Sequence, residues 1–205
     1  MEGSAAIRAV PDRPRALGLP GAAAARRALL SAAHVAPLAR HVAGLRAACP
    51  ALIFPDFDPL DGGTEAEILL LLEKPGPMTA PGRGGSGFVS RDNDDPTAEA
   101  VFRFMQAAGL HRGRTAIWNL VPGWNGTIRV SVGELREGLQ ALEGVLPLFG
   151  RLHTVVMAGR SAQRAAPMLA PRGLRLLASA HPSPQVRASR PEMWRDIPRI
   201  WSLAG

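Results

Sequence analysis

The 205-residue chain contains no tyrosine, a single cysteine and a single lysine. Cys49 cannot form an internal disulfide, and alone it cannot supply the ligands of an iron–sulfur cluster or a structural zinc site. No stretch reaches the roughly 18 uninterrupted apolar residues that cross a bilayer, and the N-terminus lacks the basic start and apolar block of a secretory signal. We therefore expect a soluble, cytoplasmic protein with no metal, no cofactor and no membrane partner.

The net charge is positive, at +7, and the basic residues are 23 arginines and one lysine, Lys74. The sequence pI is near 11.3. Such a balance favours a polyanionic partner, since each neutralised phosphate releases condensed counterions. An Arg- and Ala-rich composition can equally reflect genomic base bias. The charge therefore indicates nucleic acid without establishing it.

The order of apolar and amphipathic segments predicts an irregular N-terminal arm over 1–22 and one domain over 23–205. The first helix, about 23–47, should be kinked or split at Pro37. Apolar strands then alternate with helices. The predicted strands begin "AEILLLL", "TAIWNL", "HTVVMAG" and "LRLLASA", and the helices lie over 97–109, 131–146, 161–169 and about 190–203. This order predicts a three-layer αβα sandwich with a central, mainly parallel four-stranded sheet.

Polar exceptions to the apolar pattern fall where the predicted strands end, in "EKPGP", "WN", "AGRS" and "HPSP". Parallel strands place their carboxyl ends on one edge of the sheet, where such folds bind ligands. We therefore expect a binding site at that edge.

The stretch "SAHPSP" is the most informative, because His181 is followed by a Pro-Ser-Pro turn. The two prolines stiffen the backbone and hold the imidazole in place. A fixed imidazole can donate a hydrogen bond to an oxygen that becomes negative as a bond breaks. A lone histidine that simply ends a strand is the alternative, which the stiff turn disfavours.

"HPSP", together with "LEKPGP", "GFVSRDN", "IWNL" and "VVMAGRSAQ", resembles the uracil-DNA glycosylase superfamily over about residues 65–200. The chain is similar to the branch that usually bears an iron–sulfur cluster, but it lacks that branch's cysteines. The resemblance implies a monomeric enzyme that flips uracil or another deaminated base out of DNA. It would hydrolyse the N-glycosidic bond in base excision repair, with no cofactor.

The resemblance also implies roles for three base-facing residues. His181 would lie against the uracil O2, and the carboxamide of Asn119 would pair with N3–H and O4. Phe88 would stack on the flipped base. The alternatives are a strand-end cap for Asn119 and a core position for Phe88.

Glu73 is the candidate that orients or deprotonates the attacking water. Asp94 is the alternative carboxylate, unless Asp94 and Asp95 only cap the following helix. Lys74 has three interpretations: a phosphate contact, an ion-pair partner that keeps Glu73 ionised, or an amine that forms a Schiff base at C1′.

Two positions depart from the superfamily pattern. Lys74 stands where the uracil-specific branch has a water-positioning aspartate. Gly76 stands where that branch has a tyrosine that blocks thymine, so the pocket should admit bases other than uracil. Because the cluster cysteines are missing, packing must stabilise the N-terminal region.

The same resemblance implies DNA contacts for the remaining candidates. Ser183 would lie in the turn that enters the minor groove, and Gln185 occupies the place where the family often has a residue that fills the gap left by the flipped base. Glutamine fills that gap poorly, which predicts a preference for single-stranded or mismatched DNA. Arg160, Arg187 and Arg190 would bind phosphate. Ser86 lies in the glycine-rich loop "GRGGSGF", which has no Lys-Ser/Thr and so does not match a nucleotide-hydrolase phosphate loop.

Two other functions remain open from the sequence. One is a catalytically weak protein that binds damaged or single-stranded DNA through the same pocket. The other is a hydrolase of small nucleosides or nucleotides.

Overall fold

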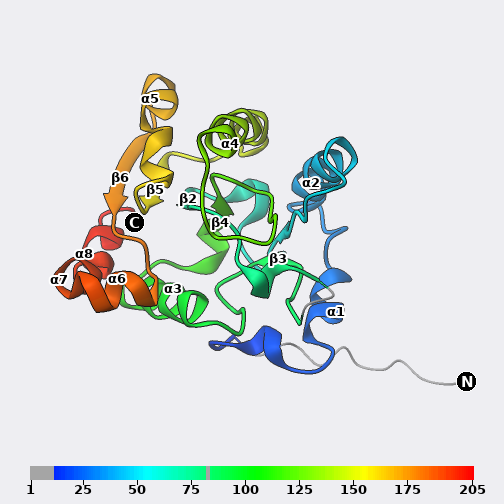
Figure 1. Cartoon of the computed structure of the whole chain (residues 1–205), viewed down its shortest axis with the longest axis horizontal. Coiled ribbons are helices and arrows are strands. Elements are labelled where there is room, and N and C mark those ends of the chain that lie inside the picture. Colours follow the sequence, from blue (N-terminus) through cyan, green and yellow to red (C-terminus); the bar gives the residue numbers. More distant parts are fainter. Residues whose placement is uncertain (1–11, 82–83) are drawn as a thin grey trace, which may run out of the picture.

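A computed structural model describes residues 12–81 and 84–205 of the chain (Figure 1). Four strands form one parallel sheet in the order β4 (Thr115–Asn119), β2 (Ile68–Leu72), β5 (Thr154–Ala158) and β6 (Arg175–Ser179). The fold is the predicted α/β class with a parallel four-stranded sheet flanked by helices.

The central strand β2 consists only of isoleucine and leucine because neighbours cover it on both edges and both faces. Leu69 pairs with Ala116 of β4 and with Val155 of β5, and all three residues are buried. A strand buried on both faces needs a continuous apolar run rather than an alternating one. The "ILLLL" run therefore defines the middle of the sheet.

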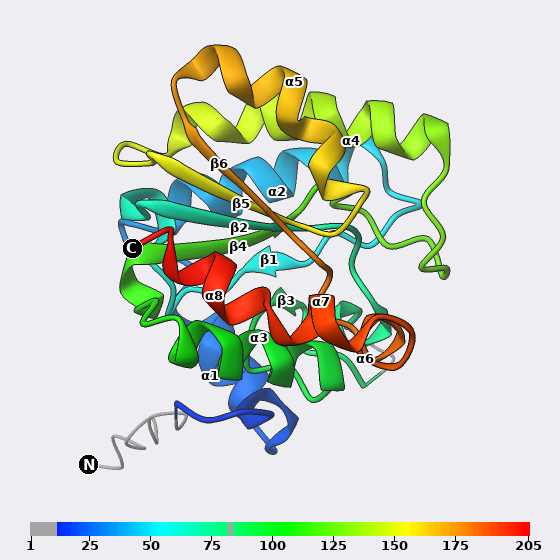
Figure 2. The same cartoon turned by 90° about the vertical axis from the view of Figure 1, so that its left-hand side faces the viewer.

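Two layers of helices cover the sheet (Figure 2). Helices α2 (Ala36–Ala48), α4 (Val132–Val145) and α5 (Ala166–Leu169) lie on one side. Helices α3 (Pro96–Ala107) and α8 (Ile197–Ser202) lie on the other. Phe104 of α3 meets Trp201 of α8 edge to face, with ring centroids 5.9 Å apart. This contact joins the two helices of that layer.

Prolines divide two of the predicted helices. The segment 23–47 forms α1 (Ala22–Arg27) and α2, which has Pro37 in its first turn. The segment 190–203 forms two short helices, α7 (Pro191–Arg195) and α8, and a further short helix that was not predicted, α6 (Pro184–Ser189), precedes them. Each of these begins with a proline in its first turn, where the missing N–H has no helical partner to lose.

A second, two-stranded parallel sheet pairs β1 (Asp56–Phe57) with β3 (Phe88–Val89). Two residues per strand are too few to produce a periodic signal, so the sequence did not predict them. Residues 12–22, the described part of the predicted arm, include one 3-10 turn, Ala16–Gly18, in which Leu17 is buried, and Ala22, the first residue of α1. The rest of that arm, 1–11, lies outside the described residues.

Within the described ranges, no helix is long and apolar enough to cross a membrane.

Candidate active site

A cavity of about 500 Å³ lies at the carboxyl edge of the sheet. Three of the sequence-predicted polar residues line it: Glu73 directly after β2, Asn119 at the end of β4, and His181 two residues after β6. A second cavity of about 680 Å³ shares Glu73 and His181 and extends toward α6 and α7. The parallel sheet thus gathers side chains that are more than a hundred residues apart in sequence.

Asn119 contributes an unpaired amide to the first cavity. The residue is only 2% exposed, and its Nδ2 has no hydrogen-bond partner among the described residues. A buried donor without a partner costs about 1–3 kcal/mol, so folded proteins rarely retain one without a use. The strand-end cap that the sequence left open is therefore not what this side chain forms. Its amide is free to meet a ligand.

Glu73 is held at one oxygen and left open at the other. Its Oε1 accepts a hydrogen bond of 2.7 Å from the Ser161 backbone N–H. The opposing Gly159 has φ +103°, and a Cβ there would lie 2.5 Å from that same oxygen. A glycine is therefore required for the carboxylate to reach this position. Among the described residues, Oε2 accepts no hydrogen bond, so it can contact a water molecule.

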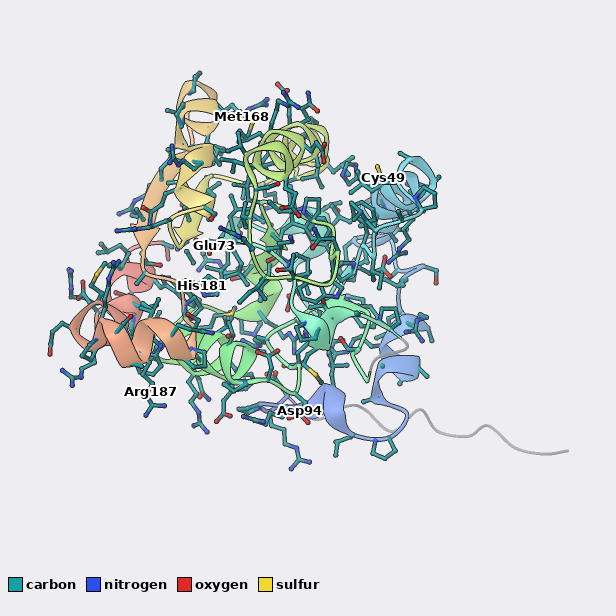
Figure 3. The ribbon with its side chains drawn as sticks, viewed as in Figure 1. Cys49, Glu73, Asp94, Met168, His181 and Arg187 are labelled. Carbon is teal, nitrogen blue, oxygen red and sulfur yellow. The ribbon has the colours of Figure 1, made fainter. Side chains whose placement is uncertain are left out.

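His181 lies within electrostatic range of Glu73. Both residues, labelled in Figure 3, line the two cavities. Burial lowers the pKa of the imidazole, while the charge of Glu73 opposes that shift. The ring is therefore neutral at neutral pH and keeps one N–H that can donate. The Ser183 N–H donates a 2.8 Å hydrogen bond to the His181 carbonyl oxygen, which closes the Pro-Ser-Pro turn.

Lys74 makes three hydrogen bonds within the protein. Its side chain is 2% exposed, and Nζ donates to Asn125 Oδ1 at 2.9 Å, to the Arg129 carbonyl oxygen at 2.9 Å and to Glu134 Oε1 at 2.5 Å. An ammonium group has three donors and no acceptor, and all three donors are used here. A planar guanidinium distributes its donors differently, so an arginine would not reproduce these three hydrogen bonds.

These contacts argue against each of the three interpretations of Lys74. Its carboxylate partner is Glu134 and not Glu73. No donor remains for a phosphate, and an ammonium with three hydrogen bonds offers no lone pair for attack on C1′. Lys74 lines the first cavity, but these contacts give no support to a catalytic role, which stays a prediction.

The acidic pair after the glycine-rich loop has two separate structural roles. Asp95 caps α3, since its Oδ1 accepts from the N–H groups of Thr97 at 2.8 Å and Ala98 at 2.9 Å. Asp94 does not line the cavity and instead forms an exposed ion pair with Arg15 at 2.9 Å. The capping alternative holds for Asp95 alone. Glu73 remains the better-placed carboxylate.

Phe88 and Ser86 lie away from the cavity. Phe88 is fully buried against Leu17 and Ala22. The next residue, Val89, lines the cavity, and successive side chains of a strand point in opposite directions. Ser86 is buried too, and its hydroxyl donates to Asn93 Oδ1 at 2.6 Å. The stacking role of Phe88 and the DNA contact of Ser86 are not compatible with this arrangement.

Gly76 lines the cavity in an extended conformation, with φ −105°. A Cβ added there would meet nothing within 4 Å. The space beside Gly76 is therefore open, which agrees with the absence of a bulky side chain at this position.

Basic and polar groups border the two cavities. Gln185 and the α6 N-cap Ser183 line the first, and Arg160 and Arg190 line the second. Arg187 is exposed on α6 and lies over the Trp194 ring, 5.1 Å from its centroid. One further residue of the first cavity, Ile128, is 67% exposed, and no motif in the sequence marked it.

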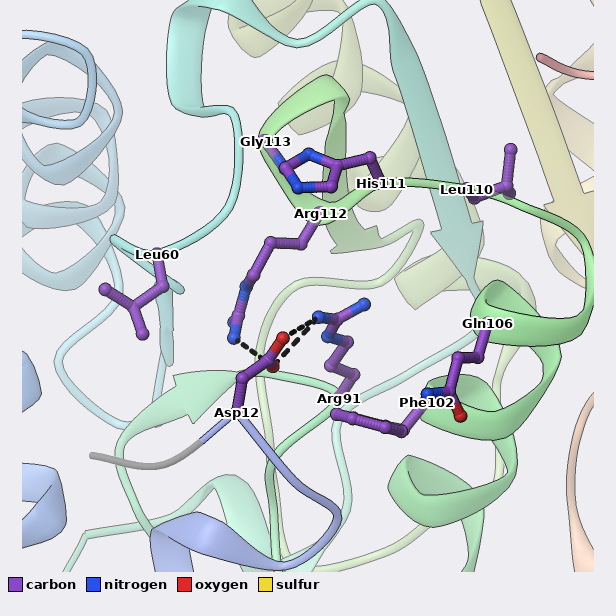
Figure 4. Close-up of a pocket in the computed structure, with 9 residues that line it drawn as sticks. All are labelled: Asp12, Leu60, Arg91, Phe102, Gln106, Leu110, His111, Arg112 and Gly113. Carbon is purple, nitrogen blue, oxygen red and sulfur yellow. Dashed lines mark hydrogen bonds and ion pairs between the residues drawn. The ribbon is translucent and has the colours of Figure 1, made fainter. Parts of the chain in front are cut away.

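A separate ionic cluster holds the N-terminal segment in place. Its members are Arg26 of α1, Arg91, Arg112 and the carboxyl groups of Asp12, Asp58, Asp61 and Asp92. Arg26 and Asp58 are at most 1% exposed. Figure 4 shows the outer part of this cluster, where Asp12 meets Arg91 at 2.9 Å and Arg112 at 3.0 Å beside a cavity of about 490 Å³. Ion pairs thus secure the N-terminal region.

The donor set does not fit an iron–sulfur cluster. Cys49 is exposed and is the chain's single cysteine. Across 12–81 and 84–205, no group of three or more His, Cys, Asp or Glu side chains could hold a metal ion.

No protein-family model and no curated protein matches the chain. Among solved structures, it is similar to the solution NMR structure of a protein described as a "putative Uracil DNA glycosylase" from Methanosarcina acetivorans. The identity is 13% and the TM-score 0.43, and the match covers 71% of this chain and 93% of that chain. Because both values are low, a function for this chain has to be argued from its own residues and contacts.

Proposed function

We propose that the protein is a DNA glycosylase that removes uracil or another deaminated base after flipping it into the cavity at the carboxyl edge of the sheet. The observation that carries the proposal is the buried, unpaired amide of Asn119 in a cavity that also contains Glu73 and His181. A carboxamide has both a donor and an acceptor, and these match the N3–H and O4 edge of uracil. The order of the sequence motifs supports the same assignment.

The chemistry follows from the three side chains. As the bond between C1′ and the base nitrogen breaks, its electron pair stays with the base, and the anionic charge spreads to O2. The neutral His181 donates a hydrogen bond to that oxygen and so stabilises the leaving group. Water adds its oxygen to C1′ and releases a proton toward Oε2 of Glu73. The products are the free base and an abasic site, and no other reactant is needed.

Charge supports a nucleic-acid substrate over a free nucleoside. The net charge is +7, and Arg160, Arg187 and Arg190 lie exposed around the strand-end edge. A free nucleoside would not require a cationic border. Steep loss of binding to oligonucleotides with rising salt is expected, because each phosphate contact releases a counterion. Salt-independent activity on free nucleosides would instead favour the small-molecule hydrolase.

The test is an abasic-site cleavage assay on oligonucleotides that carry uracil, hypoxanthine, xanthine or mismatched thymine. His181→Ala and Asn119→Leu should each lower excision by about a hundredfold or more. His153→Ala is the matched control, because His153 is exposed and precedes β5 at the opposite edge of the sheet. Asn119→Leu should leave the free energy of unfolding unchanged or raise it, since no hydrogen bond of its Nδ2 is lost.

Unchanged activity in both site variants would contradict the assignment. Binding of damaged DNA without base release would favour the catalytically weak DNA-binding protein. Gly76→Tyr adds a test of base choice, because the open space there can hold a ring. It should lower excision of thymine more than excision of uracil.

A further inference from the structure

The loop between β4 and α4 carries an apolar side chain that the proposed site does not yet explain. Ile128 is 67% exposed and lines the candidate active-site cavity, although it lies nine residues after Asn119. Exposed isoleucine has no folding benefit at this position. Its neighbours Thr127 and Arg129 are polar and also exposed, so the isoleucine is an exposed apolar side chain between two polar ones.

The loop is held rigidly, which distinguishes it from an ordinary surface connection. We name residues 125–131 the anchored loop. Its first residue, Asn125, accepts from the Lys74 ammonium at 2.9 Å and donates to Glu134 at 3.0 Å. The Arg129 carbonyl accepts from the same ammonium at 2.9 Å. The loop is therefore fixed on both sides of Ile128.

Both ends of the anchored loop are also secured. Before it, Trp124 and Ile53 exchange backbone hydrogen bonds of 2.8 and 3.0 Å. After it, Ser131 and Glu134 form a capping box at the start of α4. Gly126 adopts φ +92°, which permits the sharp turn before Ile128. A side chain on such a loop is presented in a fixed position, with little entropy left to lose on contact.

We infer that Ile128 is the wedge that enters the DNA base stack and fills the space vacated by the flipped nucleotide. This inference rests on the proposed function. Proteins that unstack DNA commonly insert isoleucine, leucine, phenylalanine or methionine between bases. The anchored loop lies at the same edge of the sheet as α6 (Figure 2), and Arg129 beside the isoleucine provides a charge for the adjacent phosphate.

This assignment gives Lys74 a purpose within the site. The ammonium does not touch the scissile bond but positions the wedge, since two of its three hydrogen bonds end in the anchored loop. It also reverses the expectation for Gln185. That residue lines the cavity from α6, but its polar side chain is poorly suited to replace a base. With Ile128 as the wedge, duplex DNA becomes a competent substrate.

The experiment compares Ile128→Ala with Ile128→Leu and with Val132→Ala. Val132 is 87% exposed at the start of α4 and does not line the cavity, so it controls for the loss of an exposed apolar side chain. Single-turnover excision is measured on uracil in single strands and in duplexes. A 2-aminopurine beside the uracil reports unstacking by its fluorescence, independently of bond cleavage.

Ile128→Ala should slow excision from the duplex by about tenfold and change single-strand excision by less than about twofold, because only the duplex requires unstacking. It should also abolish the fluorescence rise, while Ile128→Leu and Val132→Ala retain both signals. Equal duplex rates and fluorescence in Ile128→Ala and wild type would overturn the wedge, even if uracil is excised. A fluorescence rise that depends on Ile128, without any base release, would keep the wedge and overturn the proposed reaction.

Discussion

The protein buries polar side chains in two regions, one built from charged groups and the other around an uncharged amide. In the ionic cluster, Arg26, Asp58 and Arg112 are at most 9% exposed and are joined by ion pairs. At the candidate active site, the equally buried Asn119 leaves its amide without a partner among the described residues. The first arrangement is what a fold requires when charges are removed from water. The second is what a binding site requires before its ligand arrives.

The comparison shows why burial alone does not identify a site. The cavity beside Arg91 and Arg112 is similar in volume to the active-site cavity, at about 490 against about 500 Å³. Its guanidinium groups, however, already have carboxylate partners, Asp12 among them. The cluster also leaves single atoms of Asp61, Arg91 and Asp92 without hydrogen-bond partners among the described residues. The candidate site therefore differs from it in offering an uncharged, unpaired amide beside Glu73 and His181, and not in cavity size.

The largest effect should come from breaking the ionic cluster. Asp58→Ala leaves Arg26 and Arg112 without one carboxylate, and removing one partner of a buried pair costs about 3–5 kcal/mol of unfolding free energy. Asp94→Ala is the control, because the Asp94 and Arg15 side chains are 45% and 44% exposed. It should cost less than about 1 kcal/mol. Urea unfolding measures both, and equal losses would show that burial does not set the strength of these pairs.

A smaller loss of stability is expected at Lys74. This residue lines the candidate active-site cavity, but it forms a buried ion pair, as the members of the ionic cluster do. Lys74→Met should lower the unfolding free energy by about 2–3 kcal/mol, since charged hydrogen bonds to a buried group are lost. Lys74→Arg should not restore it, because the three acceptors are placed for an ammonium.

Arg129→Met provides the control for Lys74. It keeps the backbone carbonyl that accepts from the ammonium and removes only an exposed side chain. If Lys74→Met has the same free energy of unfolding as wild type, the hydrogen bonds from the Lys74 ammonium do not stabilise the anchored loop.

The smallest effect concerns pH. Burial and the nearby Asp58 charge raise the pKa of Asp61 from 3.8 to about 8. Between pH 3.8 and about 8, the folded protein therefore keeps a proton that the unfolded chain has released. The free energy of unfolding falls as the pH rises through this range. Asp61→Asn removes this dependence, while an amide oxygen can still accept from Arg112 Nε, which lies 3.1 Å from Asp61 Oδ1 in the wild type.

As the pH rises from 6 to 8, the unfolding free energy of wild type should therefore fall relative to that of Asp61→Asn. The expected change is about 1 kcal/mol per pH unit. Denaturant titrations at several pH values measure the difference. A constant difference across this range would show that Asp61 is already ionised in the folded state.

Local sequence patterns were enough to specify the sheet and the residues at its edge. Continuous apolar runs in β2, β4 and β5 require burial on both faces, and Glu73, Asn119 and His181 stand at or just after strand ends. Because parallel strands end at the same edge, these patterns placed the three side chains in one region.

The direction in which side chains point, and the charges that meet, depend on the tertiary fold. Phe88 turns into the core because the two-residue strand β3 pairs with β1, more than thirty positions earlier. Lys74 pairs with Glu134 sixty residues away, and Ile128 lines the cavity from a loop whose Asn125 and Arg129 accept from the same ammonium. Such contacts depend on distance in space rather than on spacing in the chain, so no local pattern could encode them.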